Sequence, residues 1–164
     1  ITKSLAIEVK KKIKSNKYDY FYIPLMNHIY STPVKYGWMA CLAPDGKFCL
    51  FKKKNKLWHE GLVHPSYSLK GEKGPLLENY INHFMSKDIS ELLVRFNRNS
   101  SLHAIELKNK NLKKYFSFRK VFSRFLKSYF IRKGYKEGQL GLLICIFNAL
   151  YPMVSAIKSK QDLT

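Results

Sequence analysis

Tyr18-Asp19-Tyr20-Phe21-Tyr22-Ile23-Pro24 is the stretch from which we predict the fold class. Its aromatic and β-branched residues favour a half-buried strand, and Pro24 should end regular pairing because it has no backbone N–H. The preceding residues 1–15 place leucine, valine and isoleucine at four-residue spacing among lysines, the pattern of an amphipathic helix. A helix followed by a strand predicts an α/β layer.

The middle of the chain is expected to alternate turns with short strands. Residues 25–46 contain two prolines and two glycines and predict an irregular connection, with Trp38 holding a loop against the body. Pro44-Asp45-Gly46 is a turn signal, and residues 48–51 form a short apolar strand after it. The lysines of 52–56 then predict a basic tip or edge.

A helix is expected after the strand-like segment that ends in Asn82-His83-Phe84. Ser86 can cap its free amides, and Asp88 falls in the first turn, where the helix dipole favours an anion. We expect this helix to end near Asn99-Ser100-Ser101, and a second helix to run to about Lys114.

The last third of the chain differs in character, so we divide it into a main part, 1–116, and a helical tail, 117–164. Residues 117–136 carry seven basic and no acidic residues, with aromatic residues at helical spacing. Residues 140–157 are uncharged over eighteen positions, which barely meets the length for a bilayer span. Together they favour an interfacial or re-entrant hairpin on an anionic membrane; the alternative is the core helix of a soluble bundle.

The net charge of +19, from 30 Lys and Arg against 11 Asp and Glu, predicts a polyanionic partner: nucleic acid, anionic lipid or a phosphorylated substrate. The three cysteines form no C-x-x-C pair, which indicates a reducing compartment rather than a disulfide framework or a thiolate zinc site. No cleavable signal sequence opens the chain, and its start at Ile1 suggests a fragment.

The segment 57–65 concentrates two histidines, a glutamate and a tryptophan. A cluster of this kind can be a metal site, a base with the residue that orients it, or an ordinary loop.

The order of several short motifs along the chain resembles the C-terminal half of bacterial family 2 glycosyltransferases that build lipopolysaccharide core or related surface glycans. Each motif is weakly specific, and their order and spacing carry the resemblance. They are Tyr22-Ile23-Pro24 with Asn27, Gly37-Trp38, Asp45, Cys49-Leu50-Phe51-Lys52, Val63-His64, Gly71, Gly74-Pro75-Leu76, Asn82-His83-Phe84, Phe96-Asn97-Arg98, Arg124 to Tyr129, Arg132 to Tyr135, and Gly138.

The resemblance implies the C-terminal part of a GT-A fold, an α/β sandwich, followed by amphipathic and apolar helices. It implies transfer of a sugar from a nucleotide-sugar to a lipid-linked or lipopolysaccharide acceptor with a divalent metal, Mg or Mn, at the cytoplasmic face of the bacterial inner membrane, peripherally or as a re-entrant segment. The family's Asp-x-Asp motif would precede Ile1 and occurs nowhere in this chain. The chain alone is therefore expected to lack the donor half and to be inactive.

An inverting transfer requires a base for the acceptor hydroxyl and cationic help for the leaving diphosphate. The carboxylate candidates are Glu60 and Asp45, although Asp45 is equally a turn residue. His64 is the candidate for a metal or diphosphate contact, with His59 a second cofactor contact. Relatives often carry Glu after the histidine matched by His64, where this chain has Pro65.

The acceptor side has its own candidates, each with an ordinary structural alternative. They are Trp38 and Trp58 as sugar-stacking walls, His83 as an acceptor contact, and Arg95 and Arg98 as phosphate contacts. A nucleic-acid-binding module and a non-catalytic membrane-surface module remain as alternative functions. Nucleic acid is the less favoured, because no compact reading motif occurs and residues 140–157 are unnecessary for it.

Overall fold

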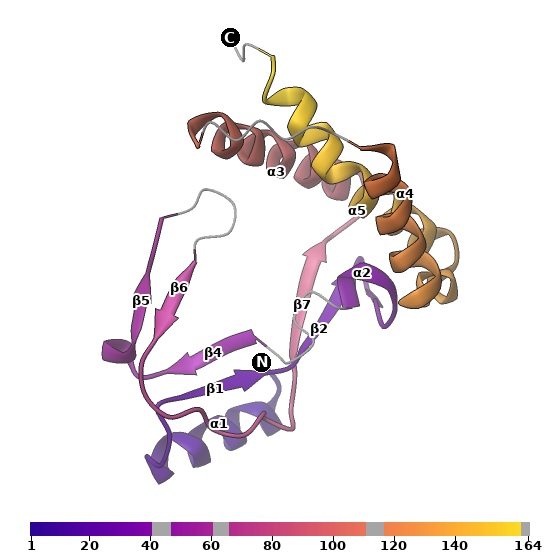
Figure 1. Ribbon diagram of the computed structural model, residues 1–164. Helices are drawn as coiled ribbons and strands as arrows, with labels where there is room; N and C mark the ends of the chain where they lie inside the picture. The colour runs from indigo at the N-terminus through magenta and orange to yellow at the C-terminus, as the bar shows by residue number, and fades with distance from the viewer. Residues whose placement is uncertain (41–46, 61–65, 111–116, 162–164) are drawn as a thin grey trace.

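Small sheets lie between one N-terminal helix and a group of C-terminal helices (Figure 1). This is a computed structural model, and it describes residues 1–40, 47–60, 66–110 and 117–161. The mixed α/β class predicted from the sequence is confirmed, with the apolar helix at the C-terminal end.

The predicted opening helix and strand are both present. Helix α1 (Lys3–Ser15) begins at Thr2, whose hydroxyl accepts a hydrogen bond from the backbone N–H of Leu5 at 3.2 Å. Strand β1 (Tyr20–Ile23) pairs antiparallel with β4 (Lys47–Phe51), the strand expected after the turn signal. Phe21 and Ile23 pack with Leu5 into one of two apolar cores.

The prediction that residues 25–46 are irregular is wrong for most of its described part. Strand β2 (Leu25–Ile29) pairs in parallel with β7 (Ile81–Ser86) and antiparallel with β3 (Thr32–Pro33), and a short helix α2 (Gly37–Ala40) follows. Pro24 does end β1, but the chain starts a strand of a second sheet at the next residue. A parallel partner so distant in sequence leaves no local signal.

A hairpin lies between β4 and β7 in the sequence. The lysines expected at a basic tip form the 3₁₀ turn η1 (Lys53–Asn55) and the start of β5 (Lys56–Trp58). Strand β5 pairs antiparallel with β6 (Tyr67–Leu69). In Figure 1 this hairpin rises on one side of the molecule, and β2 and β7 lie on the other.

Helix α3 (Ile89–Asn109) is one continuous helix where a break was expected near 99–101. The hydroxyls of Ser100 and Ser101 both donate to the carbonyl oxygen of Asn97 one turn earlier, so these serines are accommodated within the helix. Asp88 is the N-cap, accepting from the N–H of Glu91 at 2.7 Å, whereas Ser86, the expected cap, ends β7. The short polar run predicted a break because serine and asparagine also favour turns.

The tail consists of α4 (Phe118–Leu126), a π-helical turn η2 (Lys127–Ile131), a 3₁₀ turn η3 (Gly134–Glu137) and α5 (Gly138–Lys158). The turn η3 separates η2 from α5. Helix α5 packs on α3, where the rings of Phe96 and Phe147 stack at 4.9 Å, and its residue Ile144 joins the second apolar core.

Helix α5 combines a buried side with an exposed apolar stripe. It buries Ile144, Cys145 and Ala149, while Leu142, Ile146 and Ile157 stay exposed. Within the described residues, the helical run Gly134–Lys158 is the one long and apolar enough to cross a membrane, judged by length and composition alone. The stripe and this composition make α5 compatible with membrane association.

Candidate functional site

The hairpin carries three of the predicted site residues in sequence at the end of β5. The ring of His59 is joined to Ser68 of β6 by a 2.7 Å hydrogen bond between Nε2 and the hydroxyl. Trp58 lies edge-on to Tyr67 with ring centroids 5.7 Å apart, and Glu60 is exposed. The pairing of β5 with β6 therefore holds the histidine and the tryptophan on a fixed frame.

Lys56 occupies part of the tryptophan surface that was predicted to stack on a sugar. Its ammonium lies 3.6 Å from the ring centroid of Trp58, 4.7 Å from that of Tyr67 and 4.4 Å from that of Phe51. Such cation–π contacts are worth about 0.5–1 kcal/mol at exposed sites. One face of the indole is thus covered by a cation, and its role as a sugar wall stays a prediction.

Two predicted site residues, Asp45 and His64, lie outside the described residues. Their roles as a base and as a metal or diphosphate contact stay predictions. In the parts of the chain that the structure describes, no three His, Cys, Asp or Glu side chains gather where they could hold a metal ion.

A buried polar arrangement joins β2 to β7 through Asn27, which is 3 % exposed. Its side-chain N–H donates to the carbonyl oxygen of Met39 at 2.7 Å, and its Oδ1 lies 2.9 Å from Nδ1 of His83. Because an amide oxygen only accepts, Nδ1 of His83 carries the proton. In the neutral form of this ring the lone pair lies on Nε2.

His28, which follows Asn27 in β2, and Asn82, which precedes His83 in β7, form a second pair. Nε2 of His28 lies 3.0 Å from Oδ1 of Asn82, and the His28 ring packs at 5.0 Å from the exposed ring of Phe84. Nδ1 of His28 is buried and has no hydrogen-bond partner among the described residues. Sequence reasoning singled out His83 but did not place Asn27 and His28 beside it. The available signal was the adjacent polar pair in each strand, Asn27-His28 and Asn82-His83.

The remaining predicted acceptor residues belong to the helical side. Trp38 of α2 is half-buried and packs against the core that contains Ile29 and Ile144. Arg95 forms an ion pair with Glu91 one turn earlier at 2.7 Å, and Arg98 bonds the side chain of the adjacent Asn99 at 3.3 Å. These contacts are local to each element, as expected for the structural alternatives, and a role in phosphate binding stays a prediction.

The structure brings some of the predicted residues together and separates others. Asn27 bonds both the strand of His83 and the helix of Trp38. Trp58 ends β5 of a different sheet, formed by β5 and β6, and His59 and Glu60 follow it directly.

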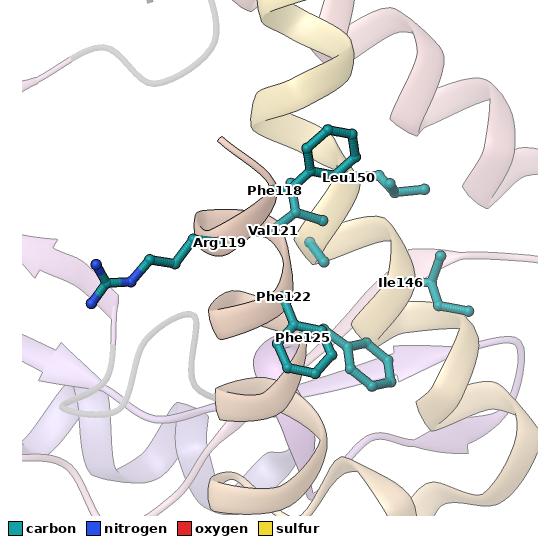
Figure 2. Close-up of a pocket in the computed structure, with 8 residues that line it drawn as sticks. Phe118, Arg119, Val121, Phe122, Phe125, Ile146 and Leu150 are labelled. Atoms are coloured by element: carbon teal, nitrogen blue, oxygen red, sulfur yellow. The ribbon is translucent and has the colours of Figure 1, made fainter. Parts of the chain in front are cut away.

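A third feature is an apolar groove of about 550 Å³ between α4 and α5 (Figure 2). Its lining residues are Phe118, Arg119, Val121, Phe122, Phe125, Ile146, Ala149 and Leu150. The two helices are also joined by Arg124, whose guanidinium donates to the backbone oxygen and to Oδ1 of Asn148 at 3.2 and 3.0 Å. Burial, and then repulsion from Arg132, lower the pKa of Arg124.

No protein-family model, no curated protein and no solved structure matches the chain.

Proposed function

We propose that this chain is the acceptor-side part of a family 2 glycosyltransferase of GT-A type. Joined to a donor half, it would transfer a sugar from a nucleotide-sugar to a lipid-linked or lipopolysaccharide-type acceptor, with inversion and with Mg²⁺ or Mn²⁺. Its place is the cytoplasmic face of the bacterial inner membrane. The order of short motifs along the sequence and the mixed α/β class support this proposal.

The observation that carries it is the bond between Asn27 and His83. Both residues belong to motifs on which the resemblance rests, and 56 positions separate them in the sequence. In the fold they are neighbours on two parallel strands, and the bond to Met39 fixes Asn27 from the opposite side. A histidine held in one tautomer by a buried amide is the kind of preorganised group that binding and catalytic sites use.

The proposed roles then fall to His83 of β7 and to residues that follow β5 in the sequence. Glu60 is the exposed carboxylate proposed to take the proton of the acceptor hydroxyl. His83, whose ring is held by Asn27, is proposed to contact and orient the acceptor. His64 and the metal would stabilise the leaving diphosphate, with His59 as a second contact.

Binding measurements on this chain test the proposal directly. Calorimetric titration should show binding of a phosphorylated core oligosaccharide and no specific binding of nucleotide-sugars with Mg²⁺ or Mn²⁺. His83→Phe should abolish oligosaccharide binding, and the exposed Asn109→Ala should leave it unchanged. Tight metal-dependent binding of a nucleotide-sugar, or no binding of the oligosaccharide, would contradict the proposal.

A non-catalytic membrane-surface module is the second candidate, and the groove beside a basic helix favours it. Replacing Glu60 and His83 in the natural protein that contains this chain separates the two. Lost sugar transfer with retained flotation on anionic liposomes supports the enzyme. Unchanged transfer would mean that Glu60 and His83 take no part in catalysis, and it supports the module. Strong salt-sensitive binding of single-stranded RNA without flotation would contradict both.

A further inference from the structure

The groove between α4 and α5 has the size and lining of a site for a small apolar ligand. Its volume of about 550 Å³ falls within the range of about 300–1,000 Å³ typical of ligand sites. Three phenylalanines and a valine of α4 form one wall, and Ile146, Ala149 and Leu150 of α5 form the other. Arg119 is the one charged residue of the lining.

Two of the lining phenylalanines are largely exposed. Phe118 is 80 % exposed and Phe122 is 64 % exposed, so both rings meet water in the isolated chain. Exposed apolar surface gathered around a groove marks an interaction site more often than scattered apolar residues do. The groove therefore favours an occupant that removes both rings from water.

The charge around the groove selects an anionic occupant. Figure 2 shows the guanidinium of Arg119 extending away from the apolar side chains, toward the outside of the groove. Lys120 lies beside it on α4, and no acidic residue occurs from residue 107 to residue 136. A guanidinium beside an apolar groove matches a molecule that has an anionic head and an apolar chain.

We propose that the α4–α5 groove binds one alkyl chain of an anionic membrane phospholipid, with the phosphate against Arg119. The site goes beyond sugar transfer, because it would fix the orientation of the polypeptide on the membrane whether or not a sugar is transferred. A second protein surface is a poorer match, since the groove is small and its lining carries a cation.

Single-chain amphiphiles below their micelle concentration test the site without a bilayer. Octyl, decyl and dodecyl phosphate should bind with increasing affinity in calorimetric titration, by about fourfold for each methylene group that enters the groove. The corresponding alkyl phosphocholines should bind more weakly, because their heads carry no net negative charge. Affinity that does not depend on chain length, or equal affinity for the two heads, would overturn the proposal.

Variants in the groove and matched variants outside it show where the alkyl chain of the amphiphile binds. Ile146→Trp places bulk in the groove from an exposed position and should abolish decyl phosphate binding, whereas Ile157→Trp, on α5 but outside the lining, should not. Phe122→Ala should weaken binding at least tenfold. Phe130→Ala removes a ring that is 56 % exposed but outside the groove, and should leave binding unchanged. Equal losses in the two members of either pair would overturn the site.

A bilayer experiment then tests whether the alkyl chain in the groove comes from a membrane phospholipid. Phosphatidylglycerol with a photoreactive group in its acyl chain, presented in vesicles, should crosslink to peptides of α4 and α5 and lose this crosslink in Ile146→Trp. A crosslink elsewhere, or a concentration-dependent dimer that Ile146→Trp abolishes without lipid, would overturn the proposal. If the glycosyltransferase proposal is wrong, oligosaccharide binding or sugar transfer will be absent while this crosslink is still observed. The failure of that proposal is therefore distinguishable from the failure of the lipid site.

Discussion

Oδ1 of Asn27 lies 2.9 Å from Nδ1 of His83, across the parallel pair formed by β2 and β7. The amide of Asn27 also donates to Met39, so its orientation is determined by two partners at once. This single side chain therefore links β7 to α2 and assigns the proton of His83 to Nδ1.

Asn27→Ala should destabilise the chain by about 1–3 kcal/mol, because a buried carbonyl oxygen and a ring N–H lose their partner. Urea denaturation measures the loss. Asn109→Ala, at an exposed position near the end of α3, should change the free energy of unfolding by less than about 0.5 kcal/mol. Nitrogen chemical shifts should show the proton of His83 on Nδ1 in the wild type and a mixture of tautomers in Asn27→Ala. Unchanged shifts would contradict the proposed orientation.

Glu8 makes the stability depend on pH in the acid range. Burial acts to raise the pKa of its carboxyl, but hydrogen bonds from the side chain of Asn79 and from the backbone of Glu78 and Asn79, together with Lys12, outweigh it and lower the pKa below 4.5. A lowered folded pKa means that the unfolded chain binds more protons in acid. The contribution of Glu8 is therefore complete above about pH 4.5 and is lost as the pH falls through the folded pKa.

Melting curves of the wild type and of Glu8→Gln at several pH values check this expectation. The wild type should be the more stable at neutral pH, and the difference should shrink steadily below pH 4.5. Lys10→Gln, an exposed change on the same helix, should give a difference without this acid dependence. A difference for Glu8→Gln that stays constant down to strong acid would contradict the role of the carboxylate.

Gly141 lets the backbone of η3 approach the first turn of α5. A methyl group at this position would meet the carbonyl oxygen of Gly134 and would lie 2.8 Å from Cβ of Glu137. Backbone at such a distance has to move, so Gly141→Ala should cost about 1–3 kcal/mol despite the better helix propensity of alanine. Thermal denaturation beside Gln139→Ala, an exposed change in the same turn, measures this cost. Equal stability of the two variants would show that η3 yields easily.

The sequence predicted the elements whose signals are local. Repeated apolar spacing indicated α1 and the tail helices, and the aromatic run indicated β1. What it missed depends on distant partners. Strand β2 exists because β7 pairs with it, and α3 continues through Ser100 because that serine is buried against α5, where the ammonium of Lys158 bonds it at 2.9 Å.

The candidate site likewise has a part that the sequence could predict and a part that depends on distant partners. Chemistry-bearing residues such as His59 and His83 are recognisable from their type, but the residue that orients each one comes from another strand, Ser68 in one case and Asn27 in the other. The groove between α4 and α5 needs both helices at their final crossing. The basic and aromatic residues of the tail could therefore predict an anionic surface as partner, but not a groove that binds an alkyl chain.

Arg124 and Asn148 test whether α5 is held in the helical bundle. Asn148 is a polar residue in an apolar helix, it is 6 % exposed, and Arg124 bonds both its backbone and its side-chain oxygen. Arg124→Met leaves two buried oxygens without that donor and should destabilise the chain by about 1–3 kcal/mol. Arg124→Met with Asn148→Leu removes the side-chain oxygen together with its donor, so the double variant should regain much of the loss. Urea denaturation of both single variants and the double variant completes the cycle, with a coupling of about 0.5–3 kcal/mol expected for residues in contact. Losses that simply add would mean that α5 leaves α4 in solution, and the groove between the two helices would then not persist.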